Sequence, residues 1–160
     1  MKKLLFIGFI FLTLSSSFAQ EKLPNIVLKN LDGKSINVSE IKTENVTVFS
    51  FWATWCVPCI NELDAINEEY IDWQDETNVK LYAVSIDNAR TQSRVKPLVN
   101  GKGWEYEVLL DTNEDFKRFV NANSVPYVII VKNGEIVYKH SGYTPGSEVE
   151  LFEKIKELSK

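Results

Sequence analysis

The sequence predicts an α/β fold in which a central mixed sheet carries helices on its faces. Short β-branched and aromatic runs alternate along the chain with stretches whose apolar residues recur every three or four positions. The 160 residues are 44% hydrophobic and 25% charged, an ordinary globular composition, and they suffice to bury one core. Strands that alternate with helices in this way pack as a sheet between helical layers.

The charge of the chain argues against two classes of partner. Eighteen Lys and Arg residues against 22 Asp and Glu residues give a net charge of −4, and the basic residues form no cluster. Binding of nucleic acid or of an anionic lipid surface depends on such clusters, so neither partner is expected. No internal repeat and no Pro/Gly/Ser linker divides the chain after its N-terminal segment.

Residues 1–19 have the pattern of a secretory signal peptide. Two lysines precede an eleven-residue, largely apolar run, Leu4–Leu14, and a stretch of small residues ends at Ala19. As a helix, this run would rise about 16 Å, roughly half of a hydrocarbon core. We expect cleavage before Gln20 and a single exported domain, residues 20–160, in the periplasm or another extracytoplasmic space. An uncleaved membrane tether is the alternative.

The first half of the mature chain is expected to form a hairpin, a buried strand and a long helix. Two extended segments, 26–28 and 35–38, flank an Asp-Gly turn. The run 46–52, VTVFSFW, is typical of a strand covered on both faces. A helix begins near Pro58 and presents one apolar stripe. The stripe consists of Ile60, Leu63, Ile66, Tyr70 and Trp73.

The second half supplies further strands and helices. Strands are expected at 79–86, 107–110, 127–131 and 135–140. A weaker helix near 90–99 is interrupted by Pro97, and a second helix, capped by Asp111 or Thr112, extends to Val120. An Asn-Gly dipeptide joins the last two strands as a tight hairpin. The pattern Ser147-x-x-Glu150 predicts a capping box at the start of the C-terminal helix.

The two cysteines of the chain, Cys56 and Cys59, lie where the buried strand meets the long helix. A helix N-terminus has free N–H groups and positive potential, which should lower the pKa of the Cys56 thiol below its ordinary value of about 8.5. Cys59 lies one turn inside the helix, where it can reach Cys56 but is more easily buried. One exposed nucleophilic thiol and one covered resolving thiol are what thiol–disulfide exchange requires.

Two other interpretations of the cysteines are weaker. A structural disulfide would close only a four-residue loop and contribute about 2 kcal/mol, which a domain of this size hardly needs. A metal site would have two thiolates and the distant His140, fewer than the four ligands of a structural zinc site. We therefore expect no metal and no other cofactor.

The run FWATWCVPC, with a strand before it and a helix after it, resembles the thioredoxin superfamily, and specifically the exported TlpA/ResA-type thiol–disulfide oxidoreductases. Further similarities follow in order, from Leu23 to the C-terminus. They are the first hairpin, a strand ending at Asp87, the end of an insertion at Asp111, a proline at position 126 and the Asn-Gly turn. The resemblance implies a thioredoxin fold with an N-terminal β-hairpin and a central βα-type insertion.

The resemblance also implies a substrate groove beside the cysteines. The Val125–Pro126 bond would be cis, with the Val125 backbone free to pair with a client peptide as an added strand. Trp55, Val57 and Pro58 would border the groove. Trp55 alternatively serves as ordinary aromatic packing.

Glu62 follows Cys59 by three residues, which is similar to the CxxCxxE pattern of the ResA-like branch. Positions three apart share a helix face, so a partly buried Glu62 could exchange protons with Cys59. Ser50 stands where classical thioredoxins have a buried Asp, which favours Glu62 as the proton carrier. A solvated surface glutamate is the alternative.

By this resemblance the protein is expected to reduce disulfides of exported proteins, such as apocytochrome c or other clients, through Cys56 and Cys59. It would act as a monomer and would need a membrane thiol-reductant donor, because an oxidising compartment cannot keep the pair reduced. The alternatives are a dithiol oxidase or isomerase, a peroxiredoxin-like peroxidase and a redox-inert binding module.

Overall fold

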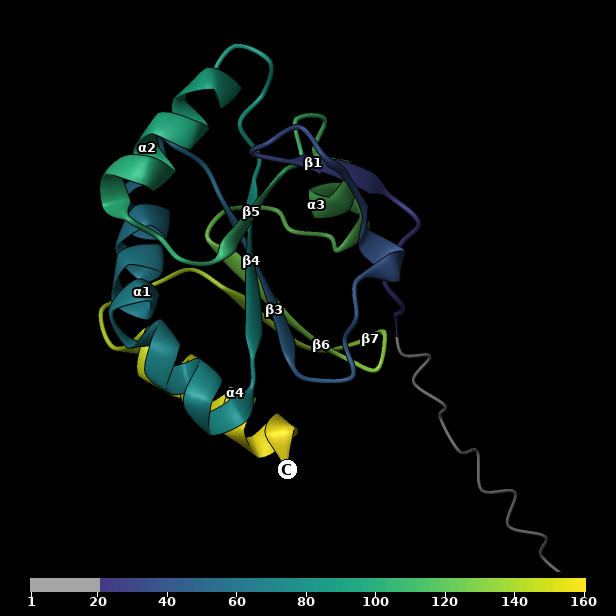
Figure 1. Ribbon diagram of the computed structural model, residues 1–160, viewed down its shortest axis with the longest axis vertical. Helices are drawn as coiled ribbons and strands as arrows, with labels where there is room; N and C mark the ends of the chain where they lie inside the picture. The colour runs from purple at the N-terminus through teal and green to yellow at the C-terminus, as the bar shows by residue number, and fades with distance from the viewer. Residues whose placement is uncertain (1–20) are drawn as a thin grey trace, which may run out of the picture.

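The protein forms one seven-stranded mixed sheet with helices on both faces, as the computed structural model of residues 21–160 shows (Figure 1). The expected α/β fold is therefore confirmed. The strands are β1 (Val27–Asn30), β2 (Ser35–Asn37), β3 (Thr47–Trp52), β4 (Lys80–Ser85), β5 (Glu107–Leu110), β6 (Tyr127–Lys132) and β7 (Glu135–Ser141). The helices are α1 (Val57–Thr77), α2 (Val95–Lys102), α3 (Asp115–Phe119) and α4 (Ser147–Ser159), with short 3₁₀ turns at Val38–Glu40 and Gln92–Arg94. The signal peptide predicted for residues 1–19 lies outside the described residues.

Strand β3 occupies an interior position in the sheet order β2-β1-β5-β4-β3-β6-β7. It pairs in parallel with β4 and antiparallel with β6, while the β1–β2 hairpin joins the sheet through antiparallel pairing with β5. Every residue of β3 is buried. The nearly uncharged VTVFSFW sequence is thus explained by helices that cover both faces of this strand.

Alternate side chains of β3 face the two helical layers. Phe49 and Phe51 contact the ring of Phe116 in α3, with ring centroids 5.3 and 5.0 Å apart. Ser50 and Trp52 point to the opposite face, where α1 and α4 lie side by side (Figure 1). One face of β3 therefore packs in the apolar core with α3, and the other face directs the Ser50 hydroxyl toward α1.

The insertion between β4 and β5 packs against α1 through aromatic residues. Trp104 contacts Trp52 with centroids 4.9 Å apart, and its indole N–H donates a hydrogen bond to Asp64. The Tyr106 hydroxyl donates to the Leu63 carbonyl at 2.6 Å. These contacts hold the insertion on the helix that carries the cysteines.

Within residues 21–160, no helix combines the length and apolarity needed to cross a bilayer.

Three predictions about helix ends are wrong or incomplete. The capping box at Ser147 does not form, because Gly146 is the N-cap residue and its N–H is bound by the Glu148 carboxylate. Pro97 does not interrupt its helix, because it lies in the first turn of α2, where a missing N–H is tolerated. Asp111 does accept amide hydrogen bonds from the start of α3, but that helix begins only at residue 115.

The first described residues pair with the edge of the sheet at β7. Leu23 N–H donates to Gly134 O at 3.0 Å, and Ile136 N–H donates to Glu21 O at 2.8 Å. The β6–β7 turn lies beside the start of β3, because Thr47 pairs with Val131. The chain thus enters the fold at the end of the sheet opposite to the one where β3 leads into the cysteines.

We expect Gly134→Ala to destabilise the protein by about 1 kcal/mol, because a side chain is disfavoured in left-handed backbone. Gly134 has φ +80° in the turn between β6 and β7, and the added methyl group would meet no neighbouring atom. Gly101→Ala is the matched control, since Gly101 also has open space but lies in α2 with an ordinary φ. Denaturant unfolding of the oxidised protein should show a loss at position 134 only, and equal effects at both positions would contradict the strain argument.

Candidate active site

Cys56 and Cys59 form a disulfide at the N-terminus of α1, with their Cα atoms 5.3 Å apart. Cys56 is the N-cap residue, and its N–H donates a hydrogen bond to Ala53 O at 3.0 Å. No side chain caps the first turn, and Pro58 lies within that turn. The Cys56 sulfur is therefore attached to the residue at which the positive end of the helix begins.

The two cysteines differ in exposure less than expected. Cys56 is 6% exposed and Cys59 is fully buried, so the ranking follows the prediction but Cys56 is not an open thiol. The bridge holds its sulfur against the buried Cys59, which explains this cover. Exposed apolar side chains flank the pair, with Trp55 59% exposed and Val57 65% exposed.

Glu62 is a buried carboxyl one helical turn after Cys59. It is 3% exposed, and its Oε2 accepts a hydrogen bond from the Ser50 hydroxyl at 3.0 Å. Burial raises the pKa of Glu62 to about 7, although the Ser50 hydrogen bond opposes this shift, and the charge of Glu148 adds to it. A solvated surface glutamate is therefore ruled out for this position.

Pro126 lies at the beginning of β6, next to the end of β3. The Val125–Pro126 peptide bond is cis, and the pairing of Phe51 with Tyr127 places this bond at the end of the sheet where the cysteine segment starts. Pro126 O accepts a hydrogen bond from Gly142 N–H at 2.9 Å. Among the described residues, no backbone hydrogen bond involves Val125. An extended peptide could therefore use the Val125 backbone groups.

Asp87 is a functional candidate that the sequence did not reveal. Its carboxylate is 1% exposed and accepts three hydrogen bonds, from Thr54 N–H at 2.8 Å, Thr54 Oγ1 at 2.6 Å and Ser85 Oγ at 2.9 Å. Thr54 lies two residues before Cys56, so Asp87 fixes the loop that carries the first cysteine. The sequence predicts a strand that ends at Asp87, but the contact of this residue with Thr54, 33 residues away, has no local signal.

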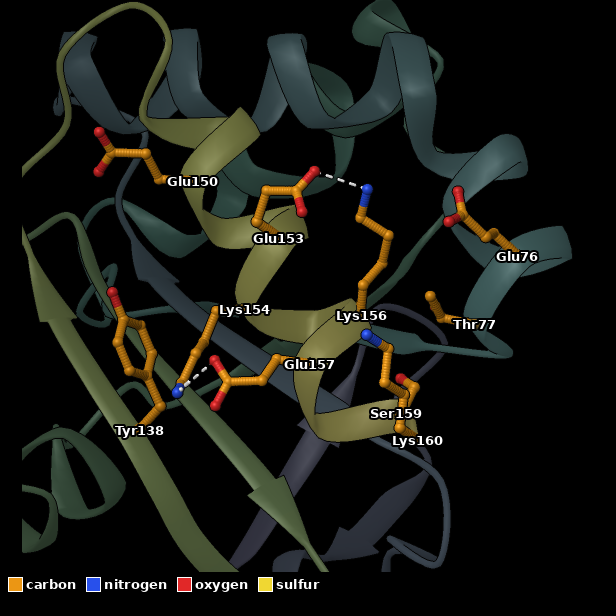
Figure 2. A pocket seen from close by; sticks show the side chains of 10 residues that line it. All are labelled: Glu76, Thr77, Tyr138, Glu150, Glu153, Lys154, Lys156, Glu157, Ser159 and Lys160. Carbon is orange, nitrogen blue, oxygen red and sulfur yellow. Dashed lines mark hydrogen bonds and ion pairs between the residues drawn. The ribbon is translucent and has the colours of Figure 1, made fainter.

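A hollow of about 740 Å³ lies elsewhere, between the C-terminal part of α4 and the end of α1. Figure 2 shows that charged side chains line it and that several pair with each other, as in Lys154–Glu157 and Lys156–Glu153. None of the cysteine-site residues lines this hollow. Within residues 21–160, no group of three or more Cys, His, Asp or Glu side chains is arranged to hold a metal ion.

Comparisons with known proteins agree with this geometry. The AhpC/TSA family model matches residues 19–139. The thiol-disulfide oxidoreductase ResA of Bacillus thuringiensis (strain Al Hakam) is 29% identical over 135 residues, which cover 84% of this chain and 76% of that protein. A thioredoxin-like protein from Porphyromonas gingivalis is 52% identical, with a TM-score of 0.76, covering 86% of this chain and 91% of that chain.

StoA from Bacillus subtilis has the same fold at 21% identity, with a TM-score of 0.64 over 81% of this chain and 99% of that chain. The family match spans most of the chain and includes the strand, the cysteine pair and the helix described above. The chain therefore belongs to the AhpC/TSA family, with a thioredoxin-like fold, and is an enzyme of the thiol-disulfide oxidoreductase type.

Proposed function

We propose that the protein is an exported reductase that breaks disulfides in other extracytoplasmic proteins, with Cys56 as the attacking residue and Cys59 as the resolving residue. The observation that supports this proposal most strongly is the disulfide at the uncapped first turn of α1. Free amides and the helix dipole at that turn stabilise a Cys56 thiolate in the reduced protein.

In the first step, the Cys56 thiolate attacks one sulfur of a client disulfide. A mixed disulfide forms between Cys56 and the client, and the displaced client sulfur leaves as a thiolate that takes up a proton. Asp87 holds the Thr54 backbone during this step and so keeps the preceding loop fixed.

In the second step, Cys59 gives its proton to the Glu62 carboxylate and attacks the Cys56 sulfur. The second client sulfur leaves as a thiolate that takes up a proton from solvent, and the Cys56–Cys59 disulfide forms, which completes a two-electron reduction of the client. Glu62 suits this role because its raised pKa, about 7, allows both protonation states near neutral pH. Residues 57–62 belong to one helix, which keeps the carboxyl one turn from Cys59.

The client is proposed to bind along the exposed apolar side chains beside the disulfide. Trp55, Val57 and Pro58 supply this surface, and the free Val125 backbone would pair with an extended client segment next to Pro126. Apocytochrome c is one client of this kind, by similarity to the cytochrome c maturation thioredoxins. A membrane thiol-reductant donor would return the pair to the dithiol form, and the domain is proposed to act as a monomer.

A redox titration tests the direction of electron flow. After equilibration with dithiothreitol or glutathione buffers, the fraction of reduced pair should give a potential near that of a reductant, about −270 mV. A value near that of a strong oxidant, about −120 mV, would instead support the oxidase alternative. In parallel, the reduced protein should cleave insulin disulfides and should not consume hydrogen peroxide; peroxide consumption would support a peroxidase.

A further inference from the structure

A narrow crevice leads from Glu62 toward the surface between β7 and the beginning of α4. Its volume is about 10 Å³, which is the space that one water molecule needs. Glu62 is buried, whereas Glu150, which also lines the crevice, is exposed. Neither cysteine nor any residue of the proposed client surface lines the crevice. The route therefore does not pass through the surface that a bound client would cover.

The sheet aligns three residues, one from each of β3, β6 and β7, on the face that carries Glu62. Ser50 in β3 pairs with Val128 in β6, and Val128 pairs with His140 in β7, so the three side chains form one row on the same face. Ser50 donates its hydrogen bond to Glu62, and Val128 and His140 line the crevice together with Glu62. The row therefore begins at Ser50, which is bonded to Glu62, and ends at the imidazole ring of His140 in β7.

The other groups near Glu62 are poorer relays. The titratable or charged groups that line the crevice with Glu62 or act on its charge are Tyr106, Tyr138, His140, Tyr143, Glu148 and Glu150. Burial and the Glu148 carboxylate raise the pKa of Tyr143 to about 12, and burial also raises the pKa of Tyr106, so these phenols stay neutral. Glu150 is an exposed residue near the start of α4, and Tyr138 projects from β7 beside Lys154, as Figure 2 shows. An imidazole ring has one nitrogen that accepts a hydrogen bond and one that donates, so it can take a proton on one side and give one up on the other, which favours His140 among these groups.

We infer that this crevice is the route by which Glu62 exchanges protons with solvent, and that His140 passes the proton on. The inference rests on the proposed function, in which Glu62 receives the Cys59 proton. Glu62 then returns to a carboxylate as its proton moves to the His140 imidazole, and the imidazolium releases the proton to solvent. One proton leaves for each one that Cys59 gave up, and no electron moves along the route. His140 is a relay that never touches the sulfurs.

A pair of His140 variants tests this route by single-turnover kinetics. Reduced protein is mixed with a disulfide-linked peptide at pH 7 and low buffer concentration, and acid quenching follows first the mixed disulfide and then the release of the second peptide thiol. In His140→Ala, the second phase should slow by on the order of tenfold while the first phase is unchanged, because only the second needs the Glu62 proton transfer. Added imidazole should restore the rate of His140→Ala but not of His140→Leu, in which the added side chain fills the space.

Lys139→Ala is the matched control, since Lys139 is the adjacent β7 residue and its side chain points to the other face, toward Val120 and Glu21. Its second phase should equal that of the unchanged protein, without an imidazole effect. Unchanged second-phase rates in both His140 variants, or slow rates that imidazole does not raise in His140→Ala, would overturn the relay. Failure of the unchanged protein to form any mixed disulfide would instead refute the proposed function.

Discussion

Cys59→Ala is expected to stop the reaction at the mixed disulfide. Cys56 remains at the N-cap of α1 and can still attack a client, but no second sulfur is left to displace that client. Steady-state insulin reduction should fall by on the order of 10³-fold or more, as when one member of a catalytic unit is lost. A client-linked protein should accumulate, visible as a band on non-reducing gels that dithiothreitol removes. Because Ala is small and apolar, the fully buried site should accept it.

Cys56→Ala is the partner variant and should form no such adduct. If Cys59 carried the attack, the adducts would appear in Cys56→Ala and be absent from Cys59→Ala. That result would reverse the assignment of the two roles. Isolation of the trapped species from cells would also identify the clients by mass spectrometry.

Glu62→Gln is expected to change how the stability of the oxidised protein depends on pH. Burial raises the pKa of Glu62 from 4.5 to about 7, so the folded protein holds the proton more tightly than the unfolded chain. Proton binding to Glu62 therefore adds to the free energy of unfolding. This contribution is fully present below pH 4.5, decreases as the pH rises toward 7, and is lost above pH 7. The shift corresponds to about 3 kcal/mol, because each pKa unit is worth about 1.4 kcal/mol.

The Gln side chain keeps an oxygen for the Ser50 hydroxyl and carries no charge, so the variant should be the more stable protein at pH 9 and nearly equal at pH 4. Denaturant unfolding at a series of pH values measures this difference. Glu69→Gln is the control, because Glu69 is an exposed residue of the same helix and its removal should leave the pH profile unchanged. Parallel profiles for Glu62→Gln and the unchanged protein would disprove the burial argument.

The sequence predicted the order and type of the elements because the relevant signals are local. Apolar spacing predicted α1, and the uncharged run predicted a strand covered on both faces. The Asn-Gly dipeptide predicted the β6–β7 turn, where Asn133 has φ +53° and Gly134 has φ +80°. These features depend on neighbouring residues alone.

Contacts between distant segments could not be read in the same way. From the sequence alone, Ser50 is only a replacement for the carboxyl of classical thioredoxins, whereas in the structure its hydroxyl donates a hydrogen bond to the carboxyl of Glu62. The same is true of the hydrogen bonds between Asp87 and Thr54 and of the low exposure of Cys56. Both depend on how β3, β4 and α1 pack together. The capping box predicted at Ser147 is wrong for a related reason, since at α4 the N-cap position is held by a glycine in left-handed backbone.

The pairing of Glu21 and Leu23 with the β6–β7 turn has a practical consequence for how the protein can be held. A bead, a surface or a fusion partner joined ahead of Glu21 would attach at the end of the sheet that lies far from the two cysteine sulfurs. Protein immobilised in this way should therefore react with large clients as readily as free protein. Attachment through the N-terminal side is thus the suitable choice for isolating trapped substrates.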